Sequence, residues 1–192
     1  MIRRSLFLLI IFLIVRCSTP HKNPHIEIQT SLGDIEVELY PDKAPKSVAA
    51  FLSYVDSGFY TNTNFYRVLN NENQPSDAFK SNLIQGGLWG IGRRKNLPGI
   101  PHETTKQTGI LHKDGAISLA RLEPGTATTE FFICVGDQPG YDYGGENNSD
   151  GQGYAAFGKV VKGMDVVNKI YNQPESDQYF TPRIPLYNIV RR

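Results

Sequence analysis

The apolar residues between Phe59 and Val161 come only in short runs, and this feature constrains the fold more than any other. Glycine, proline, asparagine and aspartate separate the runs, which span residues 65–69, 83–84, 116–120, 131–135 and 155–160. A typical helix in a globular protein has about 11 residues, so none of these runs is long enough to form one. Each run suits a short strand instead. The pattern predicts a mainly β protein whose strands form a barrel or a sandwich.

A β-hairpin is predicted ahead of this region, over residues 26–39. Apolar side chains alternate with polar ones both before and after Ser31-Leu32-Gly33, a sequence typical of a turn. Alternate side chains of a strand point to opposite faces, so one face of the hairpin is expected to be buried.

Two other segments show helical spacing. After Pro45, apolar residues recur at positions i, i+3, i+4 and i+7 until Gly58, which predicts a helix. A second helical pattern covers residues 164–171, and a last strand is expected over residues 184–190. The predicted order is hairpin, helix, several strands, helix and strand, and these elements form one domain over residues 26–192 without an internal repeat.

The charge and the cysteine content exclude several classes of protein. The 192 residues carry 20 Lys plus Arg and 19 Asp plus Glu, a formal net charge of +1. This balance leaves no basic stripe for a phosphate backbone, so we expect no nucleic-acid partner. The 2 cysteines cannot build a disulfide scaffold, and no cysteine or histidine cluster has zinc-ligand spacing. We therefore expect neither a metal ion nor a cofactor.

The N-terminal segment resembles an export signal rather than a part of the domain. A pair of arginines precedes an apolar run over residues 6–15. At about 1.5 Å per residue, this run covers only about half of a ~30 Å hydrocarbon core. A basic start followed by a short apolar run is typical of a signal peptide, which we predict over residues 1–16. Residues 17–25 are polar, contain proline and are expected to form a linker.

The end of this signal leaves three outcomes open. Residues 14–17, Ile-Val-Arg-Cys, resemble a bacterial lipoprotein box, in which Cys17 would carry the lipid and become the new N-terminus. Arg16 departs from that pattern, because the processing site wants a small residue directly before the cysteine. The other outcomes are simple secretion and an uncleaved anchor. We expect an extracytoplasmic protein, in the periplasm or envelope, that a lipid on Cys17 holds at the membrane.

Several sequence blocks, taken in order, resemble those of one family. They are Ile-Glu-Val-Glu-Leu-Tyr at 35–40, Ala-Pro at 44–45, Phe-Tyr-Arg-Val at 65–68, Ile-Gln-Gly-Gly at 84–87, Phe-Phe-Ile at 131–133 and Phe-Gly-Lys-Val at 157–160. Across about residues 26–190 they look like the successive blocks of the cyclophilin family of peptidyl-prolyl cis/trans isomerases. The resemblance implies a closed eight-stranded antiparallel barrel, capped by two α-helices, with a shallow groove for a prolyl peptide on its outside. The strings at 136–139 and 150–153 look more like bacterial extracytoplasmic members than eukaryotic cytosolic ones.

The isomerase reaction needs no nucleophile and no metal, because no bond is made or broken. Twisting an X-Pro amide out of its plane ends its conjugation, at a barrier of roughly 20 kcal/mol. The twisted proline nitrogen regains a lone pair, so a fixed cation or hydrogen-bond donor aimed at the amide lowers the barrier. A guanidinium is always charged and presents several donors in a rigid fork. Arg67 occupies the position of the family's catalytic arginine, and Gln85 matches the glutamine that binds the peptide backbone.

The resemblance also implies an apolar slot for the proline ring. The residues at these family positions are Phe132, Leu83, Tyr141 and Tyr154 for the floor and walls, and Ala120 and Arg121 for the backbone opposite them. Alternate residues of a strand face opposite ways, so Phe132 can face the groove while Phe131 fills the core. Proline-containing polypeptides are therefore the expected partners, and a monomer is the expected state.

Three residues of this groove depart from the best-known members of the family. Gly140 stands where they often carry tryptophan, Tyr141 replaces an aliphatic residue, and Tyr154 stands where they carry histidine. None of these changes touches Arg67, so we expect an active isomerase that acts on exported or envelope proteins. With Gly140 and Tyr154 in place of tryptophan and histidine, we expect it to bind cyclosporin weakly. The alternative is a non-catalytic binding module or holdase chaperone that grips proline-containing segments in the same groove. Trp89, the only tryptophan of the sequence, is expected to pack under a loop.

Overall fold

The computed structural model of this chain describes residues 23–92 and 96–192. The predicted export signal and the predicted lipid site at Cys17 lie outside these residues. In the described part, the first strand begins at His25, one residue before the predicted start of the domain.

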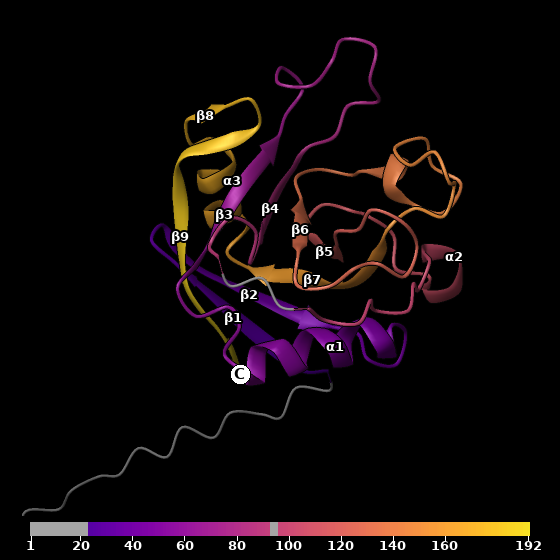
Figure 1. The fold of residues 1–192 in the computed structure, drawn as a ribbon, viewed down its shortest axis with the longest axis horizontal. Coiled ribbons are helices and arrows are strands. Elements are labelled where there is room, and N and C mark those ends of the chain that lie inside the picture. Colours follow the sequence, from indigo (N-terminus) through magenta and orange to yellow (C-terminus); the bar gives the residue numbers. More distant parts are fainter. Residues whose placement is uncertain (1–22, 93–95) are drawn as a thin grey trace, which may run out of the picture.

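Within the described residues, eight antiparallel strands close into a barrel. They are β1 (His25–Thr30), β2 (Gly33–Leu39), β3 (Thr63–Leu69), β4 (Leu83–Gly87), β5 (Ala116–Leu119), β6 (Phe131–Cys134), β7 (Ala155–Lys162) and β9 (Tyr179–Arg191). Neighbours follow the order β1-β2-β7-β5-β6-β4-β3-β9, and β9 also pairs with β1, which closes the barrel (Figure 1). The remaining strand, β8 (Glu175–Ser176), pairs with the start of β9. The predicted eight-stranded antiparallel barrel is confirmed.

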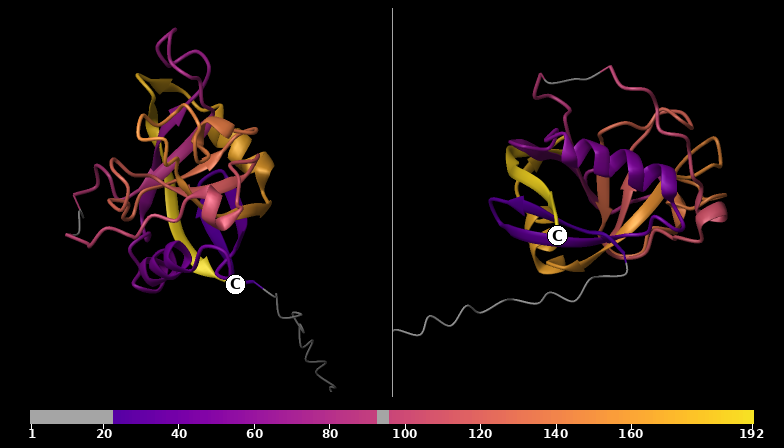
Figure 2. Two further views of the ribbon diagram at one scale, coloured as in Figure 1. Left: turned by 90° about the vertical axis from the view of Figure 1, so that its right-hand side faces the viewer. Right: turned by 90° about the horizontal axis from the view of Figure 1, so that it is seen from below.

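Two helices pack against the barrel where the sequence predicts them. α1 (Pro45–Asp56) begins at its predicted proline and packs against β7 and β9. α3 (Met164–Tyr171) packs against β2 and β4. In Figure 1, α1 runs along the lower edge of the barrel, and the right-hand view of Figure 2 shows it from below. Within residues 23–92 and 96–192, no helix is long and apolar enough to cross a membrane.

Two short elements leave no recognisable signal in the sequence. α2 (Thr105–Thr108) is a single turn, and a capping box between Thr104 and Gln107 closes its first turn. β8 is two residues long. Elements this short show no hydrophobic period, so a sequence pattern cannot reveal them.

The last strand is longer than predicted, because β9 begins at Tyr179 rather than at residue 184. Proline cannot donate a hydrogen bond to a neighbouring strand, so Pro182 hides the first part of this strand in the sequence. β9 passes through Pro182 and Pro185, with a shift in register against β3. The early start places Tyr179 opposite Arg67 and brings the turn between β8 and β9 to the site.

The two neighbouring phenylalanines of β6 face opposite ways, which confirms the prediction made for them. Phe131 has no exposed surface, and its ring makes edge contacts with three others at centroid distances of 5.6–5.7 Å: those of Phe51, Tyr60 and Phe65. Phe132 belongs to a separate, smaller apolar cluster on the other face of the strand. This smaller cluster forms the floor of the pocket described below.

The connection from β3 to β4, residues 70–82, projects from the barrel at the top of Figure 1. Its own polar side chains hold it together, since the Asn70 amide donates to Asn73 Oδ1 (2.9 Å) and Gln74 Nε2 donates to the Ser81 carbonyl (2.8 Å). The turn between β8 and β9 joins the base of this connection, where the Val68 amide donates to the Gln178 carbonyl (2.8 Å).

Candidate active site

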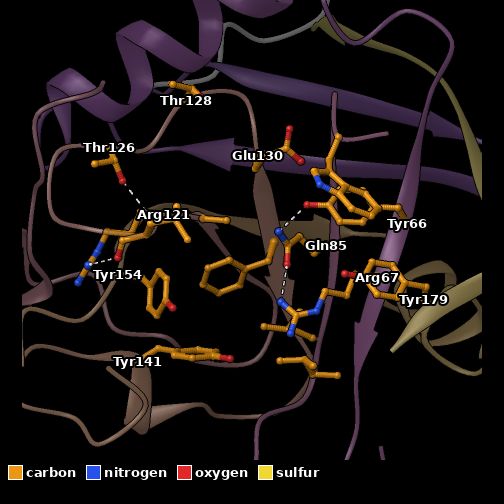
Figure 3. Close-up of a pocket in the computed structure, with 16 residues that line it drawn as sticks. Tyr66, Arg67, Gln85, Arg121, Thr126, Thr128, Glu130, Tyr141, Tyr154 and Tyr179 are labelled. Atoms are coloured by element: carbon orange, nitrogen blue, oxygen red, sulfur yellow. Dashed lines mark hydrogen bonds between the residues drawn. The ribbon is translucent and has the colours of Figure 1, made fainter. Parts of the chain in front are cut away.

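A pocket of about 420 Å³ opens on the outer face of β4 and β6 (Figure 3). Its lining residues are Tyr66, Arg67, Leu69, Leu83, Gln85, Trp89, Ala120, Arg121, Leu122, Thr126, Thr128, Glu130, Phe132, Tyr141, Tyr154 and Tyr179. All the residues predicted for catalysis and substrate binding lie in this lining: Arg67, Gln85, Phe132, Leu83, Tyr141, Tyr154, Ala120 and Arg121. The fold therefore brings the predicted residues together, and their individual roles stay predictions.

The register of three strands aligns the central residues of the pocket. Arg67 of β3 lies opposite Gln85 of β4, and Gln85 lies opposite Phe132 of β6. Side chains that face each other across antiparallel strands have Cβ atoms only about 4.5–5.5 Å apart. The guanidinium, the amide and the aromatic ring therefore form one row across the barrel wall.

Neutral oxygen atoms, rather than carboxylates, hold the Arg67 guanidinium. The side-chain oxygen Oε1 of Gln178 accepts hydrogen bonds from Nη2 (2.6 Å) and from Nε (3.1 Å) of Arg67, and Oε1 of Gln85 accepts a longer one from Nη1 (3.4 Å). Arg67 takes part in no ion pair among the described residues. Its positive charge is therefore oriented without being neutralised.

Tyr66 sets the orientation of the Gln85 amide. Gln85 Nε2 donates to the Tyr66 hydroxyl (2.6 Å), so the oxygen of the same amide faces Arg67. Burial raises the pKa of Tyr66 well above its usual value, and the nearby Glu130 carboxylate raises it further. The hydroxyl thus stays neutral and available to the amide. No sequence signal separates Tyr66 from an ordinary strand aromatic.

Three aromatic rings form the apolar slot beside Arg67. The Phe132 ring centroid lies 5.3 Å from that of Tyr141 and 5.4 Å from that of Tyr154, and the two tyrosine rings are 4.9 Å apart. Leu83 belongs to the same apolar cluster as Phe132. Burial raises the pKa of Tyr141 to about 12, so this part of the wall carries no charge near neutral pH. The slot fits a small apolar ring.

A buried polar chain lies behind the Phe132 ring. His112 stacks on Phe132 with centroids 5.9 Å apart, and its Nδ1 and Nε2 atoms lie 2.8 Å from Asp142 Oδ1 and 3.0 Å from Ser118 Oγ. These distances match the serine, histidine and aspartate of a hydrolase. Ser118 has no exposed surface and His112 is only 1% exposed, so no substrate reaches them in this conformation. These three hydrogen-bonded side chains support the floor of the slot through the stacking of His112 on Phe132. No motif in the sequence predicts this arrangement.

The Arg121 side chain holds a loop and offers no free charge to a substrate. Its Nη1 and Nη2 atoms donate to the two oxygens of Asp150 (2.6 and 2.9 Å), and its Nε donates to the Gly153 carbonyl (3.0 Å). Its guanidinium lies 5.3 Å from the centre of the Tyr154 ring. The hydrogen bond from Arg121 also lowers the pKa of the Asp150 carboxyl. Arg121 therefore secures the segment that leads into Tyr154.

Trp89 lines the pocket instead of packing under a loop, so the prediction for this residue is wrong. Its side chain is 39% exposed, and its ring centroid lies 5.0 Å from that of Tyr66 and 5.2 Å from that of Tyr179. The Arg183 guanidinium lies 5.4 Å from the same ring. These partners come from β3 and β9, which are distant in the sequence, so local spacing could not reveal them.

Glu130 anchors the turn that carries Trp89. Its Oε1 atom accepts a hydrogen bond from the Leu88 amide (2.8 Å). Burial raises the pKa of Glu130 above its usual value. One oxygen of the Glu130 carboxyl group thus holds the backbone of the turn, while the other, Oε2, is buried without a hydrogen-bond partner among the described residues.

Comparisons with known proteins agree with this geometry. Residues 25–190 match the family model described as cyclophilin type peptidyl-prolyl cis-trans isomerase/CLD. The chain is 38% identical over 164 residues to a peptidyl-prolyl cis-trans isomerase of Acinetobacter baylyi, covering 85% of this chain and 80% of that one. It is also 38% identical over 146 residues to peptidyl-prolyl cis-trans isomerase B of Escherichia coli, covering 76% of this chain and 82% of the relative.

The fold is similar to that of solved members of the same family. A crystal structure of a cyclophilin-type isomerase from Cryptosporidium parvum, obtained in the presence of the dipeptide Ala-Pro, superposes with a TM-score of 0.70 at 25% sequence identity. The match covers 88% of this chain and 98% of that one. Sequence and fold therefore point to the same family.

Proposed function

The chain belongs to the cyclophilin-type peptidyl-prolyl cis-trans isomerases, and we propose that its pocket lowers the barrier for X-Pro bonds of exported or envelope proteins by stabilising the twisted amide with Arg67. The observation that carries this proposal is the unneutralised guanidinium beside a slot of three aromatic rings. Family membership supports the enzyme over the alternative of a non-catalytic binding module or holdase.

Arg67 keeps donors free for a substrate. Three of the five N–H groups of a guanidinium are engaged by Gln178 and Gln85 within the described residues, which leaves two that can turn to a bound peptide. A planar amide offers its nitrogen no lone pair, whereas the twisted amide does. A donor aimed at that nitrogen therefore binds the twisted state better than either isomer, and this difference lowers the barrier.

The aromatic slot provides the binding part of the mechanism. A proline ring would sit against the three aromatic rings of the slot. Its amide would then lie next to Arg67 and Gln85, because these two side chains form one row with Phe132 across the strands. The Cryptosporidium parvum relative crystallised in the presence of Ala-Pro supports a proline-containing peptide as the substrate class. The isomerase assay on Arg67 variants described in the Discussion tests this mechanism.

The proposed location outside the cytoplasm rests on the N-terminal sequence. Export followed by acylation of Cys17 would hold the mature protein at the membrane, since acyl chains contribute about 0.8 kcal/mol for each buried CH₂. We predict that wild-type protein fractionates with membranes, that Cys17→Ser is released, and that a mass measurement of the mature N-terminus finds an acylated cysteine. A soluble wild-type product without a lipid would contradict acylation, and a product that keeps residues 1–16 in the cytoplasm would contradict export.

Cyclosporin should bind this protein about two decades more weakly than it binds family members that carry tryptophan and histidine at positions 140 and 154. A Cβ atom on Gly140 would clash with the side chain of Asn147, so the loop itself fills the space of a larger side chain. The loss of an indole donor and of its packing costs a few kcal/mol, or about 100-fold in affinity. The measurement is a titration of isomerase activity with cyclosporin, alongside such a member. Nanomolar inhibition of this chain would contradict the prediction.

A further inference from the structure

The turn between β8 and β9 reaches across to the guanidinium of Arg67 through a single side chain. Gln178 Oε1 accepts two hydrogen bonds from Arg67, from Nη2 at 2.6 Å and from Nε at 3.1 Å. We propose that Gln178 is a positioning residue for the isomerase reaction, which orients the Arg67 guanidinium toward the twisted amide while leaving its charge intact. This inference rests on the proposed role of Arg67.

The two hydrogen bonds fix the plane of the guanidinium. Nε and Nη2 lie on the same edge of the group, so an oxygen that accepts from both leaves it little freedom to rotate. Arginine is otherwise a long side chain with many rotamers, and an unrestrained donor loses much of its effect on a transition state. The bond from Nη1 to Gln85 is longer, at 3.4 Å, so Gln178 provides the closer contacts.

The Gln178 amide is itself held in one orientation. Its Nε2 atom donates to the Asn73 carbonyl (3.0 Å), which turns Oε1 toward Arg67. Its backbone is also held in place. The backbone N–H of Gln178 donates to Glu175 Oε2 (2.7 Å), and the backbone carbonyl of Gln178 accepts from the Val68 N–H (2.8 Å). Through these hydrogen bonds, Gln178 joins the turn between β8 and β9 to the 70–82 connection and to β3, the strand that carries Arg67.

The backbone of Gln178 points to a role for its side chain. Its φ is +73°, in the left-handed region that favours glycine over residues with a long side chain. A glycine would suit this backbone better and would keep both backbone hydrogen bonds. A strained conformation that carries a side chain to a reacting group is the pattern expected of a functional residue.

The neutral amide also matters chemically. A carboxylate at the same place would bind Arg67 more tightly, but it would neutralise the charge that the twisted amide needs. An amide oxygen orients the guanidinium through a dipole and adds no net charge. Glutamine at this position therefore suits the proposed reaction better than glutamate would, because it orients Arg67 without neutralising its charge.

The test compares full-length Gln178→Gly with Asp177→Gly, a neighbouring control. Asp177 also has a positive φ of +51° and is exposed, and the hydrogen bonds of the Arg67 side chain within the described residues go to Gln178 and Gln85 instead. We expect Gln178→Gly to lower kcat/KM for a short X-Pro peptide roughly 10-fold, mainly through kcat, with a Tm that does not fall. Asp177→Gly should keep wild-type kcat/KM.

A double-mutant cycle separates positioning from a general structural effect. If Gln178 acts through Arg67, then Gln178→Gly should cause no further loss in the Arg67→Ala background, when the residual activity is measured by NMR exchange. The Arg67 Nε–H signal should also exchange faster with solvent in Gln178→Gly than in wild type.

Two results would overturn the inference: wild-type kcat/KM in Gln178→Gly, or an equal loss from this change with and without Arg67. Failure of the proposed function would look different, because Arg67→Ala would then keep the wild-type rate.

Discussion

Arg67→Ala should lower kcat/KM for a short X-Pro peptide by about 100-fold to 1,000-fold, the usual effect of removing one fixed donor from a developing charge. Arg67 takes part in no ion pair among the described residues and lies on the outer side of the barrel wall, so the free energy of unfolding should change by only about 1 kcal/mol. The measurement pairs an isomerase assay with chemical denaturation of the same samples.

Two variants sharpen this test. Arg67→Lys keeps the charge but loses the rigid fork, so it should recover only a small part of the activity. Arg191→Ala removes an exposed arginine that pairs with Asp56 far from the pocket, and it should keep the wild-type rate. Turnover of Arg67→Ala at the wild-type rate would refute the mechanism, and peptide binding without turnover by the wild type would favour the non-catalytic module.

Phe131→Ala should lower the free energy of unfolding by about 3–5 kcal/mol, the range measured when a buried aromatic ring is removed from a core. The Phe131 ring has no exposed surface and contacts three other rings, so its loss leaves a cavity that the barrel cannot close. Urea denaturation measures the effect. The molecules that remain folded should keep kcat/KM within a few-fold of wild type, because Phe131 faces away from the pocket.

Phe132→Ala is the matched comparison on the same strand. Phe132 packs in the smaller cluster and lines the pocket, so its removal should raise KM and lower kcat/KM strongly for each folded molecule. Stability should also fall, because the ring is only 2% exposed and is braced by His112. Equal activity losses in the two variants, after correction for the folded fraction, would contradict the assignment of opposite faces.

The helices and strands whose patterns lie within a few consecutive residues could be predicted from the sequence. α1 begins at Pro45 and carries an apolar stripe, and the first hairpin alternates on either side of its turn, so each pattern is complete within a few residues. The order of the sequence blocks indicated the family, and through it the barrel and the pocket residues. Such signals need no information about which strands pair.

The detailed site depends on contacts that no local pattern encodes. Gln178 is 111 positions from Arg67, and they meet only because β9 starts early and passes through two prolines beside β3. Trp89 meets aromatic residues from two different strands, and the chain from Asp142 through His112 to Ser118 crosses three segments. In each case, the closed barrel brings a turn or loop beside a strand that is distant in the sequence.

Sequence alone was therefore enough for the class of fold, for the family and for a guanidinium next to an aromatic slot, because spacing and block order carry that information. Tertiary structure decided how the charge of Arg67 is held, that Arg121 rather than Arg67 is paired with a carboxylate, and that Trp89 lines the pocket. The physical reason is that a hydrogen bond or ring contact depends on the distance between atoms in space. Barrel closure sets that distance for residues that are far apart in the chain.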